Sequence, residues 1–148
     1  MVEIRDYLAE HRVTFLETTD KNEALEQMVQ VAKNDEMVTD FESFREAVFH
    51  RESLVSTGIG QNVAIPHIKH NSVSQFFITV GISKGGIEWN SFDKQPVHLA
   101  FLIAGPEDHE HYLQILAKLT LIVRNPSLRT DIINSNSRAE VMQRFENL

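Results

Sequence analysis

The sequence predicts an α/β sandwich, in which helices cover the faces of one β-sheet. Three observations support this fold class. Apolar segments of strand length alternate along the chain with segments whose apolar residues recur every three or four positions. Capping and turn residues separate these segments, and no repeat, low-complexity tract or linker interrupts them. The length of 148 residues suits a single domain, which we expect to span residues 1–148.

The N-terminal part of the chain predicts one short strand among three helices. Residues 2–8 favour a short helix, and residues 13–16 favour a strand. Asp20 can cap a second helix, because Glu23 follows three positions later, as in a capping box. The apolar residues of this helix recur on one face, namely Ala24, Leu25, Met28, Val29 and Ala32. A third helix is expected from residue 39 or 40 to about residue 52.

The middle of the chain predicts a loop and three strands. Residues 56–62 have the Ser, Thr, Gly and Asn content of a loop. Residues 63–65 form a short predicted strand that Pro66 stops. A second strand is expected over residues 75–83, ending at the turn Lys84-Gly85-Gly86. The third, over residues 97–104, is apolar enough to lie inside a sheet.

The C-terminal third predicts three helices. A long helix follows Gly105-Pro106 and runs to about residue 124. Its apolar positions suggest one buried face, made by Leu113, Leu116, Ala117, Thr120 and Val123. Two shorter helices are expected over residues 126–133 and 137–145. Ser137 caps the last of them, and Glu140 stands in capping-box position.

Composition and charge exclude several classes of function. The formal net charge is −7, from 14 basic and 21 acidic residues, whereas nucleic-acid binding needs a surplus of Lys and Arg. The absence of cysteine excludes disulfide and thiolate chemistry. The apolar run at residues 97–105 is too short to cross a bilayer, and the N-terminus lacks the features of a signal peptide. We therefore expect a cytoplasmic protein with no nucleic-acid partner, no direct membrane insertion and no cofactor.

The most informative stretch, residues 51–67, reads RESLVSTGIGQNVAIPH. His67 follows Pro66, whose ring restrains the local backbone. A neutral imidazole is a competent nucleophile toward phosphorus, and its ordinary pKa keeps it available near neutral pH. A histidine after proline is, taken alone, more often an ordinary turn residue. The functional interpretation gains weight because a cation and hydroxyl groups stand close by in the sequence.

Those neighbouring groups suit a phosphoryl site. Arg51 offers a planar guanidinium whose fork matches phosphoryl oxygens. Ser56 and Thr57 supply hydroxyls in a loop whose backbone N–H groups can also bind an anion. The residues themselves thus predict a site for a phosphoryl group, with His67 as the nucleophile and Arg51, Ser56 and Thr57 as phosphate-binding support.

The same stretch resembles the enzyme IIA domain of the phosphoenolpyruvate-dependent phosphotransferase system, in its fructose/mannitol type, a family that includes the nitrogen-regulatory IIA proteins. The family pattern is Arg-Glu, a spacer, Ser-Thr-Gly, and a strand that ends in Ala-(Ile/Val)-Pro-His. Here it reads Arg51-Glu52, Ser56-Thr57-Gly58 and Ala64-Ile65-Pro66-His67. The similarity continues through residues 96–106 and 113–119, so it covers nearly the whole chain.

The resemblance implies an α/β sandwich around a mixed sheet and a phosphohistidine at His67, formed on Nε2. Its phosphoryl donor would be HPr or an HPr-like phosphocarrier, and Arg51 would steady the transferred group. In sugar uptake the acceptor would be a cysteine of a IIB domain. The alternative that the family offers is a nitrogen-regulatory IIA protein, whose phosphorylation state controls its binding to regulatory protein targets.

Three positions depart from the family pattern. Asn62 stands where many members have Gly, and we expect it to keep a positive φ, since Asn tolerates left-handed backbone. Gln61 stands where mannitol-type members can carry an acidic residue, which would remove a negative charge near the incoming phosphate. Tyr112 occupies the slot of a second active-site histidine in a gapless match, with His111 and His109 just before it.

Three interpretations of this second position stay open. His111 reaches the site if the preceding loop takes up one residue, the hydroxyl of Tyr112 substitutes for it, or the second group is absent. His111 is retained as a site-support candidate. The pair His109 and His111 also suggests a metal site, but zinc needs three or four convergent ligands, so we expect no metal.

Overall fold

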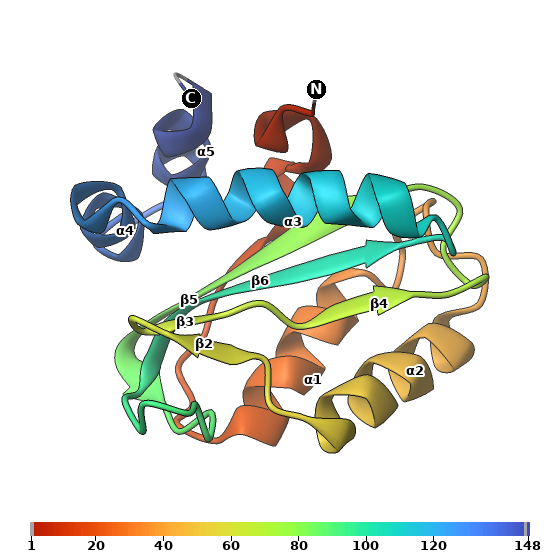
Figure 1. The fold of residues 1–148 in the computed structure, drawn as a ribbon, viewed down its shortest axis with the longest axis horizontal. Helices are drawn as coiled ribbons and strands as arrows, with labels where there is room; N and C mark the ends of the chain where they lie inside the picture. Colours follow the sequence, from red (N-terminus) through yellow and green to blue (C-terminus); the bar gives the residue numbers. More distant parts are fainter. Residues whose placement is uncertain (1, 147) are drawn as a thin grey trace.

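The structure, a computed structural model, describes residues 2–146 and 148. Its centre is a six-stranded mixed β-sheet (Figure 1). The strands are β1 (Val13–Phe15), β2 (Gly58–Gly60), β3 (Val63–Ala64), β4 (His67–Lys69), β5 (Phe77–Ile87) and β6 (Val97–Gly105). Their order across the sheet is β1-β5-β6-β3-β2, and β4 also pairs with β6. The predicted α/β sandwich and its mixed sheet are confirmed.

The long strand β6 positions the edge of the sheet that matters for function. It runs antiparallel to β5 and parallel to both β3 and β4. Val63 of β3 pairs with Leu99, and His67 of β4 pairs with Ile103, so β3 and β4 follow one another along the same side of β6. Pro66 lies between β3 and β4. The ladder is interrupted there because a proline has no N–H to donate to the neighbouring strand.

The helices form a layer on each side of the sheet (Figure 1). The helices α1 (Lys21–Val31) and α2 (Phe41–Leu54) cover one face. On the other face lie α3 (His109–Val123), α4 (Pro126–Ile133) and α5 (Arg138–Glu146), together with two 3-10 helices at the N-terminus. None of the helices in the described part of the chain has both the length and the apolar content needed to cross a membrane.

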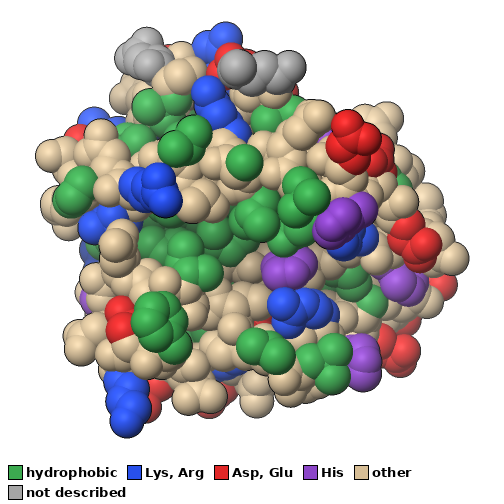
Figure 2. Space-filling model, viewed as in Figure 1, with side chains coloured by type: hydrophobic (Ala, Val, Ile, Leu, Met, Phe, Trp, Pro, Cys, Tyr) green, Lys and Arg blue, Asp and Glu red, His purple; other side chains and the backbone are tan. Residues whose placement is uncertain are grey.

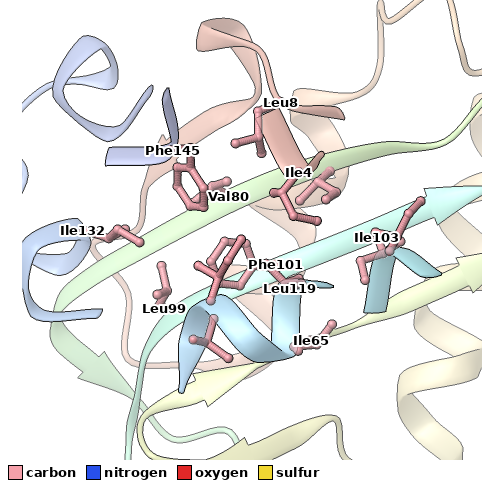
Figure 3. Close-up of a cluster of buried hydrophobic side chains, with 14 of the residues drawn as sticks. Ile4, Leu8, Ile65, Val80, Leu99, Phe101, Ile103, Leu119, Ile132 and Phe145 are labelled. Atoms are coloured by element: carbon pink, nitrogen blue, oxygen red, sulfur yellow. The ribbon is translucent and has the colours of Figure 1, made fainter. Parts of the chain in front are cut away.

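Each face of the sheet carries its own hydrophobic core. Figure 3 shows the core under α3 and α5, where Val80 and Phe101 of the sheet lie close to Ile4, Leu119 and Phe145. The opposite core is built from the alternate residues of the same strands and from α1 and α2. Because β5 and β6 are buried on both faces, they read as continuous apolar runs rather than as alternating patterns.

The predicted helix caps are confirmed at both ends of the chain. Asp20 accepts a hydrogen bond from the Glu23 N–H at 2.9 Å, and Ser137 accepts one from the Glu140 N–H at 3.1 Å. Each satisfies one of the N–H groups that a helix start leaves without a partner. The helix predicted over residues 2–8 is a short 3-10 helix, Ile4–Tyr7, and a second 3-10 helix, Glu10–Arg12, was not predicted.

Two strand predictions were incomplete. The segment 56–62, predicted as a loop, contains β2, which pairs with β3 in an irregular register, Gly58 opposite Ala64 and Gly60 opposite Val63. The strand β5 does not stop at Lys84 but continues to Ile87 through an irregular register, with Gly86 at φ 90°. Glycine supplies that left-handed step without steric cost, so a sequence that reads as a turn is here a distortion inside a strand.

The predicted buried face of α3 was wrong by about one position. Its buried residues are Tyr112, Ile115, Leu119, Ile122 and Val123. Leu113, which was predicted to face the core, is instead 46% exposed. Apolar residues occur around most of this helix, so helical periodicity fits more than one face. The correction matters because it turns Tyr112 toward the sheet.

Candidate functional site

His67 is the first residue of β4, and its side chain lies on the α3 side of the sheet. The Pro66 carbonyl accepts a hydrogen bond from the Ile103 N–H at 2.9 Å, which fixes the chain just before the histidine. Along β4 the side chains alternate, and Ile68 packs into the core beneath α1 and α2. His67 and Lys69 therefore share the opposite, partly exposed face.

The imidazole of His67 is held in one tautomer. Its Nδ1 lies 3.0 Å from the Ile65 carbonyl oxygen. A carbonyl only accepts hydrogen bonds, so Nδ1 carries the proton and the lone pair of the neutral ring is on Nε2. Burial lowers the pKa of His67, and the positive charges of Arg51 and Lys69 lower it further. A neutral ring with a free Nε2 is the reactive form for attack on phosphorus.

Arg51 brings a permanent positive charge to this ring from the other face of the sheet. It lies in the last turn of α2, and its Nη1 donates to the Val55 carbonyl at 3.1 Å. Its charge lowers the pKa of both His67 and Tyr112, so it acts on both groups at once. The structure thus puts Arg51 in electrostatic reach of His67, and its role as phosphate-binding support stays a prediction.

Tyr112, rather than His111, is the aromatic neighbour of His67. The two rings stack, with centroids 5.1 Å apart and an interplanar angle of 29°. Lys69 lies over the same tyrosine ring, with Nζ 4.7 Å from the centroid, and it also donates a hydrogen bond to Nδ1 of His109. Burial raises the pKa of Tyr112, so its hydroxyl stays protonated at neutral pH.

His111 makes its contacts elsewhere. Its Nε2 lies 2.7 Å from the Tyr7 hydroxyl, and its ring meets the ring of Phe76 edge-on at 4.7 Å between centroids. The side chains of His109 and His111 thus have separate partners. Within the described residues, no group of three or more His, Cys, Asp or Glu side chains is arranged to hold a metal ion.

Ser56 and Thr57 do not present their hydroxyls to a ligand. The Ser56 hydroxyl donates to the Trp89 carbonyl at 3.1 Å and accepts from the Gly58 N–H at 3.2 Å. The Thr57 hydroxyl donates to Glu52 at 2.6 Å and accepts from the Trp89 indole at 3.3 Å. The predicted phosphate-binding role of these two residues therefore lacks structural support, because both hydroxyls are engaged inside the protein.

The Ser-Thr-Gly motif instead joins α2 to the loop after β5. Glu52 accepts from the Thr57 N–H at 2.9 Å and forms an ion pair with Lys21, also at 2.9 Å. A Cβ at position 58 would lie only 2.0 Å from Oγ of Ser91, so glycine is needed for this close approach. The motif holds the end of α2, and with it Arg51, against the sheet.

The two departures near β3 have clear structural consequences. Asn62 has φ 66°, which confirms the predicted left-handed conformation, and its side chain donates to the Pro96 carbonyl at 2.8 Å. The Gln61 amide oxygen accepts from Arg129 of α4 at 3.1 Å. Along β6, the partner of Val63 is Leu99 and the partner of His67 is Ile103. These two partners are four residues apart, which is roughly 13 Å along a strand. The expectation that Gln61 lies near the phosphate was therefore wrong.

Sequence reasoning missed Lys69 and gave Glu52 no role. A signal for Lys69 was present, because residues two apart on a strand share a face and Lys69 follows His67 by two. Glu52 gave no such signal, since a glutamate at a helix end is usually exposed, whereas this side chain is 4% exposed.

The surface around this region mixes positive charge with apolar side chains. Figure 2 shows histidine, lysine and arginine side chains together below α3, with hydrophobic side chains around them. Three large exposed apolar residues adjoin residues of this site in the sequence, Leu54 and Val55 just after Arg51 and Leu113 directly after Tyr112. Exposed apolar side chains beside a reactive group favour contact with another macromolecule.

Comparison with known proteins identifies the family. Residues 6–148 match the family model described as phosphoenolpyruvate-dependent sugar phosphotransferase system, EIIA 2. The chain belongs to this EIIA family. It is 32% identical over 143 residues to the fructose-specific EIIABC component of Bacillus subtilis, covering 95% of this chain but 22% of that protein. It is 31% identical to the fructose-specific EIIA component of Haloferax volcanii, covering 82% of this chain and 79% of the relative.

Solved EIIA structures share the fold. The nitrogen regulatory protein IIA-Ntr from Neisseria meningitidis superposes with a TM-score of 0.87 at 28% identity, covering 96% of this chain and 98% of that one. The Escherichia coli IIA mannitol enzyme, solved in complex with its phosphorylated IIB partner, gives a TM-score of 0.82 at 17% identity, covering 95% and 98%. EIIA domains are phosphotransferase components, and the mannitol IIA enzyme of Escherichia coli binds a IIB partner in its solved complex.

Proposed function

We propose that this EIIA domain is a cytoplasmic phosphoryl carrier that accepts a phosphoryl group on Nε2 of His67 from HPr or an HPr-like protein. The observation that carries the proposal is the hydrogen bond from Nδ1 to the Ile65 carbonyl, because it leaves Nε2 as the free nucleophile. The next acceptor is a cysteine of a IIB domain in sugar uptake.

The transfer needs little from the protein beyond position and charge. The Nε2 lone pair forms a bond to phosphorus while the bond from phosphorus to the donor nitrogen breaks, and its electron pair stays with the donor. The proton on Nδ1 of His67 remains there, shared with the Ile65 carbonyl. Arg51 neutralises charge on the phosphoryl oxygens, since its guanidinium already acts on the ring.

A regulatory role is the second candidate. The Neisseria meningitidis structure at 28% identity is a nitrogen regulatory protein, and a relative of that description from Bradyrhizobium diazoefficiens is 32% identical over 118 residues. In that role phosphorylation of His67 would control binding to regulatory proteins. Transfer from the phosphorylated domain to an isolated IIB domain supports uptake, whereas stable binding to a non-transporter protein that depends on phosphorylation supports regulation.

The test of the proposed function is site-specific labelling. The protein is incubated with phosphoenolpyruvate, enzyme I and HPr, and the phosphoryl group is located by mass spectrometry at alkaline pH. We expect a single labelled residue, His67, and no label in His67→Ala. His50→Ala, which changes an exposed histidine of α2, is the matched control and should be labelled normally. Label that persists in His67→Ala would overturn the proposal.

A further inference from the structure

Tyr112 combines a buried ring with an uncommitted hydroxyl. The residue is only 5% exposed, yet its hydroxyl has no hydrogen-bond partner in the part of the chain that the structure describes. In that part of the chain, the fully buried side-chain oxygens without a partner are those of Thr79 and Ser91. The Tyr112 oxygen is not among them, so it is not fully buried and reaches solvent. Buried polar groups normally find a partner, and an unpaired hydroxyl at the end of a buried ring is available for a ligand.

The place of this hydroxyl is set by two charged neighbours and by His67. The Tyr112 ring stacks on the imidazole at 5.1 Å between centroids. Arg51, in the last turn of α2, acts electrostatically on both Tyr112 and His67 and lowers the pKa of each. Lys69 fixes the tyrosine ring from β4 by a cation–π contact, with Nζ 4.7 Å from the centroid.

We propose that Tyr112 is a further catalytic residue of this site, whose hydroxyl donates a hydrogen bond to a non-bridging oxygen of the phosphoryl group on Nε2 of His67, with Lys69 as a positioning residue. This inference rests on the proposed function. The hydroxyl keeps its proton throughout the transfer, so Tyr112 contributes a hydrogen bond and no proton-transfer step. This hydrogen bond supplements the charge of Arg51 and takes the role of phosphate-binding support that was expected of Ser56 and Thr57.

The chemical donor phosphoramidate allows a test that does not depend on a protein partner. Its bond between phosphorus and nitrogen breaks as the Nε2–phosphorus bond of His67 forms, and ammonia leaves. Phosphorus NMR follows the rate of formation of the phosphohistidine. Tyr112→Phe keeps the stacked ring and removes only the hydroxyl, so a lost hydrogen bond is separated from lost packing.

We expect Tyr112→Phe to slow phosphorylation of His67 by about 10- to 100-fold, the range for one hydrogen bond to a charged group. Tyr7→Phe removes the other tyrosine hydroxyl of the chain, which bonds to His111, and it should leave the rate unchanged. Lys69→Met should slow the reaction by about 2- to 5-fold, in keeping with an exposed cation–π contact.

A second variant gives a signature that a purely structural role would not produce. Tyr112→His places a group that titrates near neutral pH against the phosphoryl oxygens. Relative to the rate of the Tyr112 protein at the same pH, its rate should rise as the pH falls from about 8 to about 6, because the comparison removes the titration of His67 and of the donor, which both proteins share. A Tyr112→Phe rate within twofold of wild type, or a ratio for Tyr112→His that does not change with pH, would overturn the role of Tyr112 alone. Absence of label at His67 in the wild-type protein would overturn the proposed function as well.

Discussion

At position 67 a single backbone contact determines the chemistry that the side chain can perform. The Ile65 carbonyl binds Nδ1 at 3.0 Å and leaves Nε2 free, while burial lowers the pKa so that the ring stays neutral. Pro66 cannot join the ladder by its nitrogen, and its carbonyl binds Ile103 instead. The tautomer and the position of the His67 ring are thus set by Ile65 and Pro66, two apolar residues that take no part in the reaction.

The lowered pKa of His67 predicts a pH dependence of stability. Between the folded pKa and the unfolded value of 6.5, the unfolded chain binds a proton that the folded protein does not. The free energy of unfolding should therefore decrease as the pH falls below about 6.5. Urea unfolding at pH 8 and pH 5.5 should show a smaller decrease in His67→Gln than in wild type. Equal decreases, or an NMR titration midpoint of His67 above 6.5, would contradict this.

Arg51→Lys tests the guanidinium separately from its charge. Lysine keeps the positive charge but loses the fork that matches phosphoryl oxygens and the bond to the Val55 carbonyl. We expect the rate of phosphotransfer from HPr to fall about tenfold or more, and the free energy of unfolding to fall by only about 1 kcal/mol. Stopped-flow transfer and urea unfolding on the same samples measure both quantities.

The control for Arg51→Lys lies on the same helix. Arg45 pairs with Glu26 of α1, away from His67. Arg45→Lys should therefore leave the transfer rate unchanged while it weakens the ion pair with Glu26. An unchanged rate in Arg51→Lys would remove Arg51 from the site.

Residue chemistry predicted the left-handed Asn62, which the structure confirms, and it proposed His67 and Arg51 as site residues, whose roles stay predictions. These predictions depend on local properties: nucleophilicity, the shape of a guanidinium and backbone tolerance. Ser56 and Thr57 were placed less well, because a hydroxyl binds a buried carboxylate or a carbonyl as readily as a phosphate oxygen. Their partners, Glu52 and Trp89, depend on how distant segments meet.

At the scale of elements, the joint between α2 and β2 sets the position of Arg51. Glu52 lies beside Arg51 in the sequence but turns inward, where it binds both the N–H and the hydroxyl of Thr57. Lys21 of α1 pairs with the same carboxylate and lies over the Trp89 ring. This network connects α1, α2 and the loop after β5, so its loss should affect both stability and the site.

Glu52→Gln is expected to destabilise the protein by about 1–3 kcal/mol, because it leaves the partly buried Lys21 without its counterion and weakens the bonds to Thr57. Phosphorylation of His67 should also slow, since the end of α2 is less firmly held. Glu46→Gln, at an exposed position of the same helix, should change stability by less than about 0.5 kcal/mol. Urea unfolding of both variants decides, and equal effects would refute the proposed role of the joint.

The elements that sequence reasoning missed are those defined by pairing rather than by composition. The strands β2 and β4 have three residues each, and their sequences carry no clear alternation. They are strands because β2 finds hydrogen-bond partners on β3, and β4 finds them on β6. The face of α3 was mistaken for a related reason, since only the sheet decides which side of a mostly apolar helix is buried. The long apolar strand β6 was predicted almost to the residue, and so was the short helix α4, which Asn125 caps and which begins at a proline.

Over the whole molecule, the site occupies an edge where both helical layers meet the sheet. His67 and Lys69 come from β4, Tyr112 comes from α3 on one face, and Arg51 comes from α2 on the other. Exposed apolar residues such as Leu54 and Leu113 border this region, in a protein whose net charge is −7. A partner that covers His67 therefore meets local apolar and positive groups on an otherwise acidic molecule.

Phosphorylation should change what this surface binds through charge, without a large rearrangement of the fold. The backbone at His67 is held by the bonds of β4 to β6 and by Pro66, so the new group has little freedom to move it. By analogy with other phosphoryl groups, a phosphohistidine adds roughly two negative charges beside an apolar surface. Partners that bury this surface should be repelled unless they bring an arginine or a helix N-terminus to meet the anion.

It follows that the phosphoryl donor and the next acceptor should bind one overlapping surface centred on His67 and exclude each other. NMR chemical-shift mapping of the EIIA domain with HPr and with a IIB domain should give footprints that share Leu54, Val55 and Leu113. Phosphorylation alone should shift resonances close to His67 and leave those of the core between β5 and α5 unchanged. Two separate footprints, a stable ternary complex, or extensive shifts far from His67 would each contradict the prediction. The surface is expected to work this way because the proposed nucleophile, His67, lies at its centre, where two partners cannot reach it together.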